Sequence, residues 1–253
     1  MKVVVRIVNY IRSHGLTHRQ FKEFFFSFEE EYPDIPYHAE VRWLSKGKVI
    51  SRIFRLRHTV AQFLESKGRP EPLFHDPEWV ADLGFLADIM AFLNDLSLKL
   101  QKENNLINDM ISKINAFQYK LKLLKNNLSE KNTQHFPELA SVQEGGRFEK
   151  YVEVLQSLEN AFNDRFQEIS YLQPILDVFV KPFSMDIESA PSDLHFKLID
   201  LQSDVHQKDV FYNTKGLLQF YQNLSKEEFP KIAVSQSLVP DLSSIIANKI
   251  KSP

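Results

Sequence analysis

The sequence predicts an all-α protein, and three observations carry this prediction. Glycine, which tight turns and phosphate-binding loops need most, occurs only 7 times in 253 residues. Cysteine is absent, which excludes disulfides, thiolate zinc sites and cysteine nucleophiles. Apolar side chains recur at helical spacing through long stretches without proline. We therefore expect a multi-helix domain without thiol chemistry.

Composition places the chain among ordinary globular proteins. Hydrophobic residues make up 43% and charged residues 25% of the sequence. No stretch approaches the roughly 20 apolar residues that a membrane span needs. The apolar run at residues 2–11 is interrupted by Arg6, and no small-residue cleavage site follows it. We expect a soluble, intracellular protein that does not contact a membrane.

The first 65 residues are predicted to form three helices. Apolar residues at helical spacing predict the first helix over residues 2–11, in preference to a strand at 3–5. Gly15 is predicted to stop this helix, and Thr17 to cap a second one with a phenylalanine stripe. A third helix is predicted over residues 44–65.

A sustained heptad pattern follows Asp76-Pro77, which is a strong helix start. One ladder comprises Leu86, Leu93, Leu100, Ile107, Ile114, Leu121 and Leu128, and a second follows three places on. Glu103 breaks the second ladder, so a kink or turn there would give two antiparallel helices instead of one rod. Two interpretations stay open: a coiled-coil surface for self-association or a partner, built on the residues from Leu86 to Leu121, or a helix buried in its own bundle.

The second half of the chain is predicted to alternate helices and connections. Residues 129–149 are polar and contain proline and a glycine pair, which is typical of a mobile connection. A helix is expected over 148–179, with Pro174 as a kink or boundary. Shorter helices are expected at 194–201 and 210–224.

Charge is distributed unevenly along the chain. The formal net charge is −2, but residues 1–67 carry +5, residues 68–149 carry −3 and residues 150–253 carry −4. We expect basic N-terminal helices, then a long helical hairpin or kinked helix with a polar linker over 68–147, and a C-terminal helical part over 148–253. Together these segments are predicted to form one composite helical domain.

The most informative candidate site is a basic segment at residues 42–57, which holds six basic residues and no acidic one. Lysine and arginine neutralise phosphates and tryptophan stacks on unpaired bases, so the segment is a candidate DNA contact. The residues proposed for it are Arg42, Trp43, Lys46, Lys48 and Arg52. The alternative is a solvated helix face on which the tryptophan anchors the core.

Enzymatic chemistry has no support in the sequence. His14 and His18 are four residues apart, but Gly15 between them breaks the helix that would align them on a metal. Acidic pairs at 186/188 and 200/204 have no partner residues that converge on them. No phosphate loop, nucleophile elbow or zinc signature occurs. We predict no enzyme activity, no catalytic or metal-binding residues, no cofactor and no small-molecule substrate.

Residues 37–48, Tyr-His-Ala-Glu-Val-Arg-Trp-Leu-Ser-Lys-Gly-Lys, resemble a segment of hAT-superfamily transposases and their domesticated vertebrate descendants. These descendants include BED-zinc-finger transposase-like proteins and the transposase-derived region of general transcription factor II-I repeat domain-containing proteins. Further matching segments lie at residues 7–13, 18–21, 88–90, 117–123, 188–191 and 199–202. The resemblance covers about residues 1–232.

The resemblance implies a specific place in the transposase fold. In that family a ribonuclease-H-like core carries three catalytic acids, and a large all-α insertion separates the second acid from the third. The chain is similar to that insertion, so the core and all three acids are expected to be absent, and residues 233–253 depart from the family pattern. Two-metal phosphoryl chemistry needs those carboxylates. In active relatives the tryptophan that corresponds to Trp43 lies near the transposon end.

Three functions follow as hypotheses. The first is a catalytically inactive helical remnant of a domesticated transposase that binds a protein partner or itself. The resemblance implies a nuclear location, and a cytoplasmic location stays open. The second is a weak DNA-binding module that uses the basic segment. The third is a truncated gene product without independent function.

Overall fold

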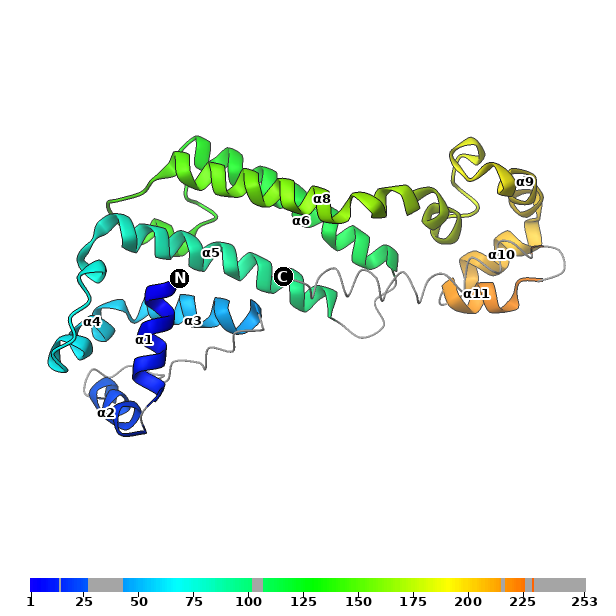
Figure 1. The fold of residues 1–253 in the computed structure, drawn as a ribbon. Coiled ribbons are helices and arrows are strands. Elements are labelled where there is room, and N and C mark those ends of the chain that lie inside the picture. The colour runs from blue at the N-terminus through cyan, green and yellow to red at the C-terminus, as the bar shows by residue number, and fades with distance from the viewer. Residues whose placement is uncertain (14, 27–42, 102–106, 215–216, 226–228, 230–253) are drawn as a thin grey trace. The chain divides into compact units, whose positions relative to one another are not determined.

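The computed structural model describes residues 1–13, 15–26, 43–101, 107–214, 217–225 and 229 (Figure 1). Every secondary-structure element in these ranges is helical. The helices are α1 Lys2–Ser13, α2 Gly15–Phe26, α3 Trp43–Arg55, α4 Arg57–Ser66, α5 Pro77–Leu100, α6 Ile107–Ser129, α7 Pro137–Ala140, α8 Phe148–Val180, α9 His195–Ser203, α10 Val205–Asn213 and α11 Leu217–Asn223. Short 3₁₀ turns span Pro72–His75, Ile187–Ser189 and Ser192–Leu194. The predicted all-α class is confirmed.

The chain divides into two compact units. The first comprises residues 1–99 and 119–158, and the second comprises residues 100–118 and 159–253. The helices α6 and α8 therefore contribute residues to both units. The three segments expected from the sequence do not correspond one to one with these units and stay a prediction.

The core of the first unit forms where the apolar faces of α1 to α4 meet α5. Each helix contributes residues three or four positions apart, as expected for amphipathic helices that share one core. The buried members include Val4, Ile7, Val8 and Ile11 of α1, Phe21 of α2, Val49, Ile50 and Ile53 of α3, Val60, Phe63 and Leu64 of α4, and Leu83, Ala87 and Met90 of α5. The rings of Phe21 and Phe63 meet edge to face at 5.1 Å. The predicted helix at residues 2–11 is confirmed.

Two predicted helix starts have different outcomes. Asp76 caps α5 as expected, because its Oδ1 accepts a hydrogen bond of 3.0 Å from the backbone N–H of Glu78. The prediction for α2 is wrong, since this helix begins at Gly15 and Thr17 lies inside its first turn. The helix penalty of glycine is only about 1 kcal/mol relative to alanine, and burial of Phe21 of the same helix in the core outweighs it.

The helix predicted over residues 44–65 is two helices. Leu56 separates α3 from α4 with φ −93° and ψ 12°, outside helical geometry. Arg57 stabilises the break, because its Nη1 donates to the carbonyl of Phe54 at 3.0 Å and its guanidinium lies over the Phe54 ring. The apolar spacing continues across the break, and so the sequence pattern did not reveal it.

The heptad stretch also forms two helices. The helix α5 ends at Leu100 and α6 begins at Ile107, and Glu103 lies outside the described residues. In the first unit, α5 and the C-terminal half of α6 run in opposite directions (Figure 1). The rod of a single long helix is therefore excluded.

The segment at residues 129–149 contains more structure than a mobile connection. It includes α7, and the side chains of Phe136 and Leu139 are buried. Phe136 stacks on Phe85 of α5 with ring centres 6.0 Å apart. The prediction missed α7 because two isolated apolar residues in a polar segment show no periodicity.

In the second unit, α6 and α8 pair in antiparallel fashion. Gln118 Nε2 donates to Asn163 Oδ1 at 2.8 Å, and the rings of Phe117 and Phe162 lie 5.0 Å apart. The helix α8 continues through Pro174, so this proline is not a helix boundary.

The C-terminal helices of the second unit close around an aromatic cluster. Its members are Phe179, Phe183, Phe211, Phe220 and Tyr221. The buried Tyr221 hydroxyl lies 2.8 Å from the carbonyl of Phe179, to which it donates, and burial raises the pKa of Tyr221. The helix predicted at 210–224 is two helices, α10 and α11.

Candidate functional site

The basic segment lies on α3 of the first unit. Arg42 is outside the described residues, and Trp43 is the first residue of α3, with a side chain that is also outside them. Lys48 is exposed, whereas Lys46 and Arg52 are half-buried. Of the five proposed residues, the structure thus places three side chains.

Helical periodicity sorts these cations onto different faces. Lys48, Arg52 and Arg55 are spaced by four and three residues and share one face, whereas Lys46 lies on the opposite side of the helix. Arg55 was absent from the proposed site residues although it has the same spacing. Its Nε donates to Glu138 Oε1 of α7 at 2.7 Å.

A close helix contact fixes the orientation of α3. Gly47 is buried, and a Cβ added to it would lie 2.2 Å from Nδ2 of Asn94 on α5. The backbone of α3 therefore approaches α5 at this glycine, and the larger flanking residues lie to either side. This approach fixes which cations of α3 face the protein and which face solvent.

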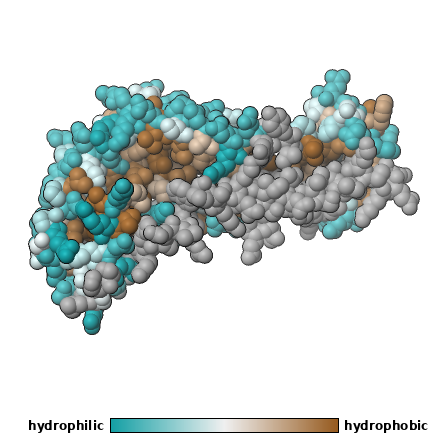
Figure 2. Space-filling model, in the orientation of Figure 1, coloured by the Kyte–Doolittle hydropathy of each residue, from teal (hydrophilic) through white to brown (hydrophobic). Residues whose placement is uncertain are grey.

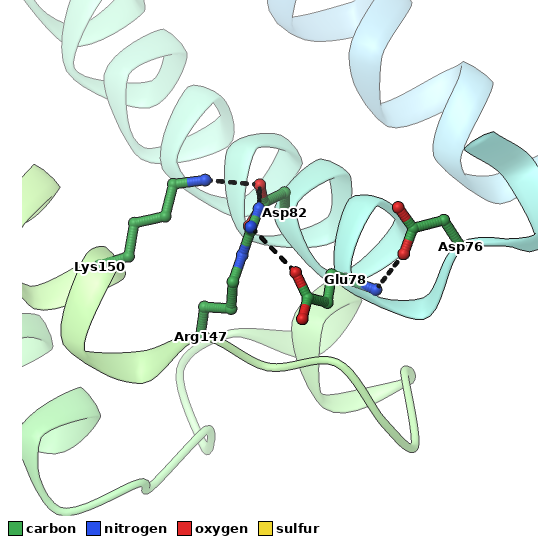
Figure 3. Close-up of polar contacts among 5 residues, drawn as sticks. All are labelled: Asp76, Glu78, Asp82, Arg147 and Lys150. Carbon is green, nitrogen blue, oxygen red and sulfur yellow. Dashed lines mark hydrogen bonds and ion pairs between the residues drawn. The ribbon is translucent and has the colours of Figure 1, made fainter.

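A second polar site joins the N-terminal part of α5 to the start of α8 (Figure 3). Asp82 of α5 receives hydrogen bonds from Lys150 Nζ at 2.7 Å and from both Nε and Nη2 of Arg147. Arg147 Nη1 also donates to Glu78 Oε2 at 3.1 Å. Burial opposes the ionisation of Asp82, but the hydrogen bonds from Lys150 and Arg147 outweigh it and hold the pKa of this carboxyl below its usual range.

Replacing Asp82 by asparagine is expected to lower the free energy of unfolding by about 1 to 2 kcal/mol, because two cations lose their shared acceptor. Urea unfolding followed by circular dichroism measures the change. Asp95→Asn is the matched control: Asp95 forms an exposed pair with Lys99 within α5, so its loss should cost less than about 0.5 kcal/mol. The contribution of Asp82 to the free energy of unfolding is full above pH 4, and it falls as the pH drops through the lowered pKa of this carboxyl. Equal losses at the two positions would contradict the role given to Asp82.

A buried carboxylate connects α5 to the start of α7. Asp88 is 3% exposed, and its oxygens accept hydrogen bonds from the backbone N–H groups of Glu138 at 3.2 Å and Leu139 at 3.0 Å. Burial raises the pKa of Asp88 to about 6, although the two N–H donors favour the charged form. Asp88 is thus the N-terminal cap of a helix that begins 49 residues later.

A third feature is the apolar outer surface of α9 and α10 in the second unit. Phe196 is 81% exposed and Ile199 44% exposed on α9, and Val205 and Tyr212 of α10 are 72% and 63% exposed. Apolar residues lie at the surface over α9 in Figure 2. The opposite face of α9 supplies Leu198 and Leu201 to the core, where both are fully buried. The outer apolar residues therefore take no part in the core that the structure describes.

The predicted interaction helix has a different environment. Leu86 and Leu93 are half-buried against the core of the first unit. Leu100, Ile114 and Leu121 are buried, and the side chain of Ile107 is outside the described residues. The placed ladder residues are therefore enclosed by their own chain, and as a partner surface the ladder stays a prediction.

Within the ranges that the structure describes, no group of three or more His, Cys, Asp or Glu residues is placed to hold a metal ion. None of the described helices has the length and apolar character needed to cross a bilayer.

Comparison with known proteins identifies the family. A family profile described as "FAM200/GTF2IRD2 helical domain" matches residues 1–129. The chain belongs to this FAM200/GTF2IRD2-like family. The match confirms the resemblance found in the sequence and agrees with the helical structure.

Two curated relatives extend the similarity beyond the profile. The chain is 34% identical over 225 residues to general transcription factor II-I repeat domain-containing protein 2 of Bos taurus, which covers 88% of the chain and 24% of the relative. The protein of the same name in Mus musculus is 33% identical over 228 residues, with the same coverage. The chain spans about a quarter of the length of these relatives. No solved structure matches it.

The family assignment places the chain among helical domains related to domesticated transposases. The FAM200/GTF2IRD2-like profile covers α1 to α6, and with them the basic segment, Asp82 and Asp88. The alignments to the relatives are longer than the profile by more than 90 residues, so the family similarity continues into the second half of the chain.

Proposed function

We propose that this FAM200/GTF2IRD2-like domain is a catalytically inactive, nuclear protein-interaction module. Its resemblance to the helical insertion of hAT transposases, which carries none of the three catalytic acids, supports the absence of DNA cleavage. The name of the two relatives, general transcription factor II-I repeat domain-containing protein 2, supports a nuclear location and a partner in transcription.

The observation that carries the proposal is the apolar outer surface of α9 and α10. Burial of large apolar side chains against a partner stabilises the complex by about 25 cal/mol per Å² of apolar surface that leaves water. Phe196 and Val205 are among the most exposed apolar residues of the described chain. The inner face of α9 is packed through Leu198 and Leu201. The helix α10 is attached through the Phe211 ring, which contacts Phe183 and Phe220. Four large apolar side chains exposed on two consecutive helices are more than the scattered single exposures that are ordinary at a protein surface, which is typical of an interaction site.

The test compares partner recovery by variants of the full chain. The tagged chain is incubated with nuclear extract, and bound proteins are quantified by mass spectrometry for wild type and for Phe196→Ser with Val205→Ser. We expect the double variant to lose the partners that the wild type recovers, because its apolar contact is gone. Tyr119→Ser with Leu123→Ser is the matched control, since these residues are also exposed but lie on α6.

Equal recovery by wild type and the α9–α10 variant would contradict the proposal. Circular dichroism spectra that superimpose show that the substitutions leave the fold intact. A strictly monomeric chain in light scattering, with no recovered partner, would also count against it.

A second candidate function is weak DNA binding through α3. The observation that favours it is the shared face of Lys48, Arg52 and Arg55 in the basic N-terminal third. Mobility-shift titrations should show binding that weakens with salt, and Trp43→Ala should cost about 1 to 3 kcal/mol if a base stacks on the indole. If the chain shifts no DNA at low salt, this function is excluded.

A further inference from the structure

The outer surface of α9 and α10 also indicates the chemistry of its partner. On α9, Phe196 and Ile199 are three residues apart and form an apolar ridge. Ridges of this kind pack into the grooves between side chains of another helix. Helix against helix is therefore the recognition mode that fits this surface.

The surface is held rigidly by its own polar contacts. Asp204 ends α9 and caps α10, because its Oδ1 accepts from the backbone N–H of Gln207 at 3.0 Å. Gln202 Nε2 donates to the carbonyl oxygens of Pro182 at 2.8 Å and Met185 at 3.1 Å, which ties α9 to the preceding turn. A surface that is ordered before binding loses less conformational entropy on association.

The charge around the ridge has one dominant sign. Residues 184–213 contain six acidic and only two basic side chains. Asp200 lies four residues after Phe196 on α9, within one helical turn of the ridge, and Asp193 lies in the 3₁₀ turn directly before α9. Asp200 Oδ2 lies 3.7 Å from Lys197 Nζ in an exposed ion pair. Such a pair contributes little to stability, so Lys197 competes only weakly with a cation of a partner for Asp200.

We propose that this acidic, apolar surface binds a basic amphipathic helix of a protein partner. Phe196 is the central anchor, because interface energy concentrates in large aromatic residues. Asp193 and Asp200 contact lysine or arginine residues that flank the apolar stripe of the bound helix, and they set its orientation. This inference rests on the proposed protein-interaction function and specifies the class of partner.

Two labelled peptides of 20 residues test the proposal against the full chain by fluorescence anisotropy. Both carry leucine at positions i, i+3, i+4 and i+7, and the polar positions are lysine in one peptide and glutamate in the other. We expect the lysine peptide to bind at least about tenfold more tightly, with an affinity that falls as salt rises. Phe196→Ala should weaken its binding by about tenfold or more.

The charge contribution is tested by reversal at a single position. Asp200→Lys should weaken binding of the lysine peptide by about three- to tenfold and strengthen binding of the glutamate peptide. Glu130→Lys is the matched control, because this exposed acid follows α6 and lies outside the α9–α10 surface. It should leave both affinities unchanged.

The outcomes separate this inference from the function on which it rests. If both peptides bind equally, or neither binds, while recovery from nuclear extract still requires Phe196, the basic-helix partner is overturned and the interaction function stands. If recovery does not depend on Phe196 and Val205, the interaction function itself fails at this surface.

Discussion

Replacing Gly145 by alanine is expected to lower the free energy of unfolding by about 3 kcal/mol or more. Gly145 has φ +85°, where a side chain adds strain, and a Cβ there would lie 2.3 Å from the carbonyl of Pro77 and 2.6 Å from the backbone nitrogen of Glu78. Backbone atoms cannot move aside as a flexible side chain does. The substitution should therefore push the chain before α8 away from the start of α5.

Gly68→Ala is the matched control for this prediction. Gly68 also has a positive φ of +65°, but no atom lies within 4 Å of the position that its Cβ would take. Only the backbone strain remains, so we expect a loss of about 1 kcal/mol. Urea unfolding followed by tryptophan fluorescence measures both, because Trp79 lies in the first unit and packs against Phe74. Similar losses in the two variants would show that the close approach of Gly145 to α5 is absent.

Asp88→Ala is expected to cost about 2 to 3 kcal/mol at pH 5, because it leaves the buried N–H groups of Glu138 and Leu139 without their acceptor. The matched control is Asp186→Ala. Asp186 also accepts a backbone N–H, that of Glu188 at 3.2 Å, but it is exposed and water replaces it. Its loss should cost about 1 kcal/mol or less. A loss at Asp88 no larger than that at Asp186 would contradict the capping role.

The pH dependence of stability gives a separate test of Asp88. Its folded-state pKa of about 6 lies above the value near 4 of an unfolded chain, so the folded protein holds this proton more tightly. Its contribution to stability is therefore full below pH 4 and is lost as the pH rises through 6, by about 3 kcal/mol. Asp88→Asn removes this dependence. The unfolding free energy of the wild type minus that of the variant should be larger at pH 4.5 than at pH 7.5, whereas parallel curves would overturn the assignment.

Local sequence signals account for much of the fold. The spacing of Val4, Ile7, Val8 and Ile11 predicted α1, and the Asp76-Pro77 pair predicted the start of α5, because capping and periodicity act within one turn. The same signals failed at Leu56, where apolar spacing continues across a break. That break depends on a contact of Arg57 with the carbonyl of Phe54, which no periodicity reveals.

The candidate sites were less accessible to sequence reasoning. The basic segment was recognisable in the sequence as a run of positive charge. The face shared by Lys48, Arg52 and Arg55 could be assigned only once the structure showed that all three lie on one helix, α3. In the sequence, Asp88 is one acidic residue in an apolar stretch. Its role could not be predicted, because its partners, the backbone N–H groups of Glu138 and Leu139, lie about 50 residues away. Phe196 lies on the face of α9 opposite to Leu198 and Leu201, and the sequence alone does not tell whether another helix covers that face, so its exposure followed only from the packing.

The capping of α7 by Asp88 has a consequence for the order of folding. A helix of four residues cannot form alone, because nucleation fixes several dihedral angles for a single hydrogen bond. Its N–H groups find their acceptor only once α5 presents Asp88. During synthesis, α5 leaves the ribosome first, and α7 can become ordered only against a helix that already presents Asp88. We therefore expect α7 to acquire hydrogen-exchange protection after α5, although its own sequence resembles a linker.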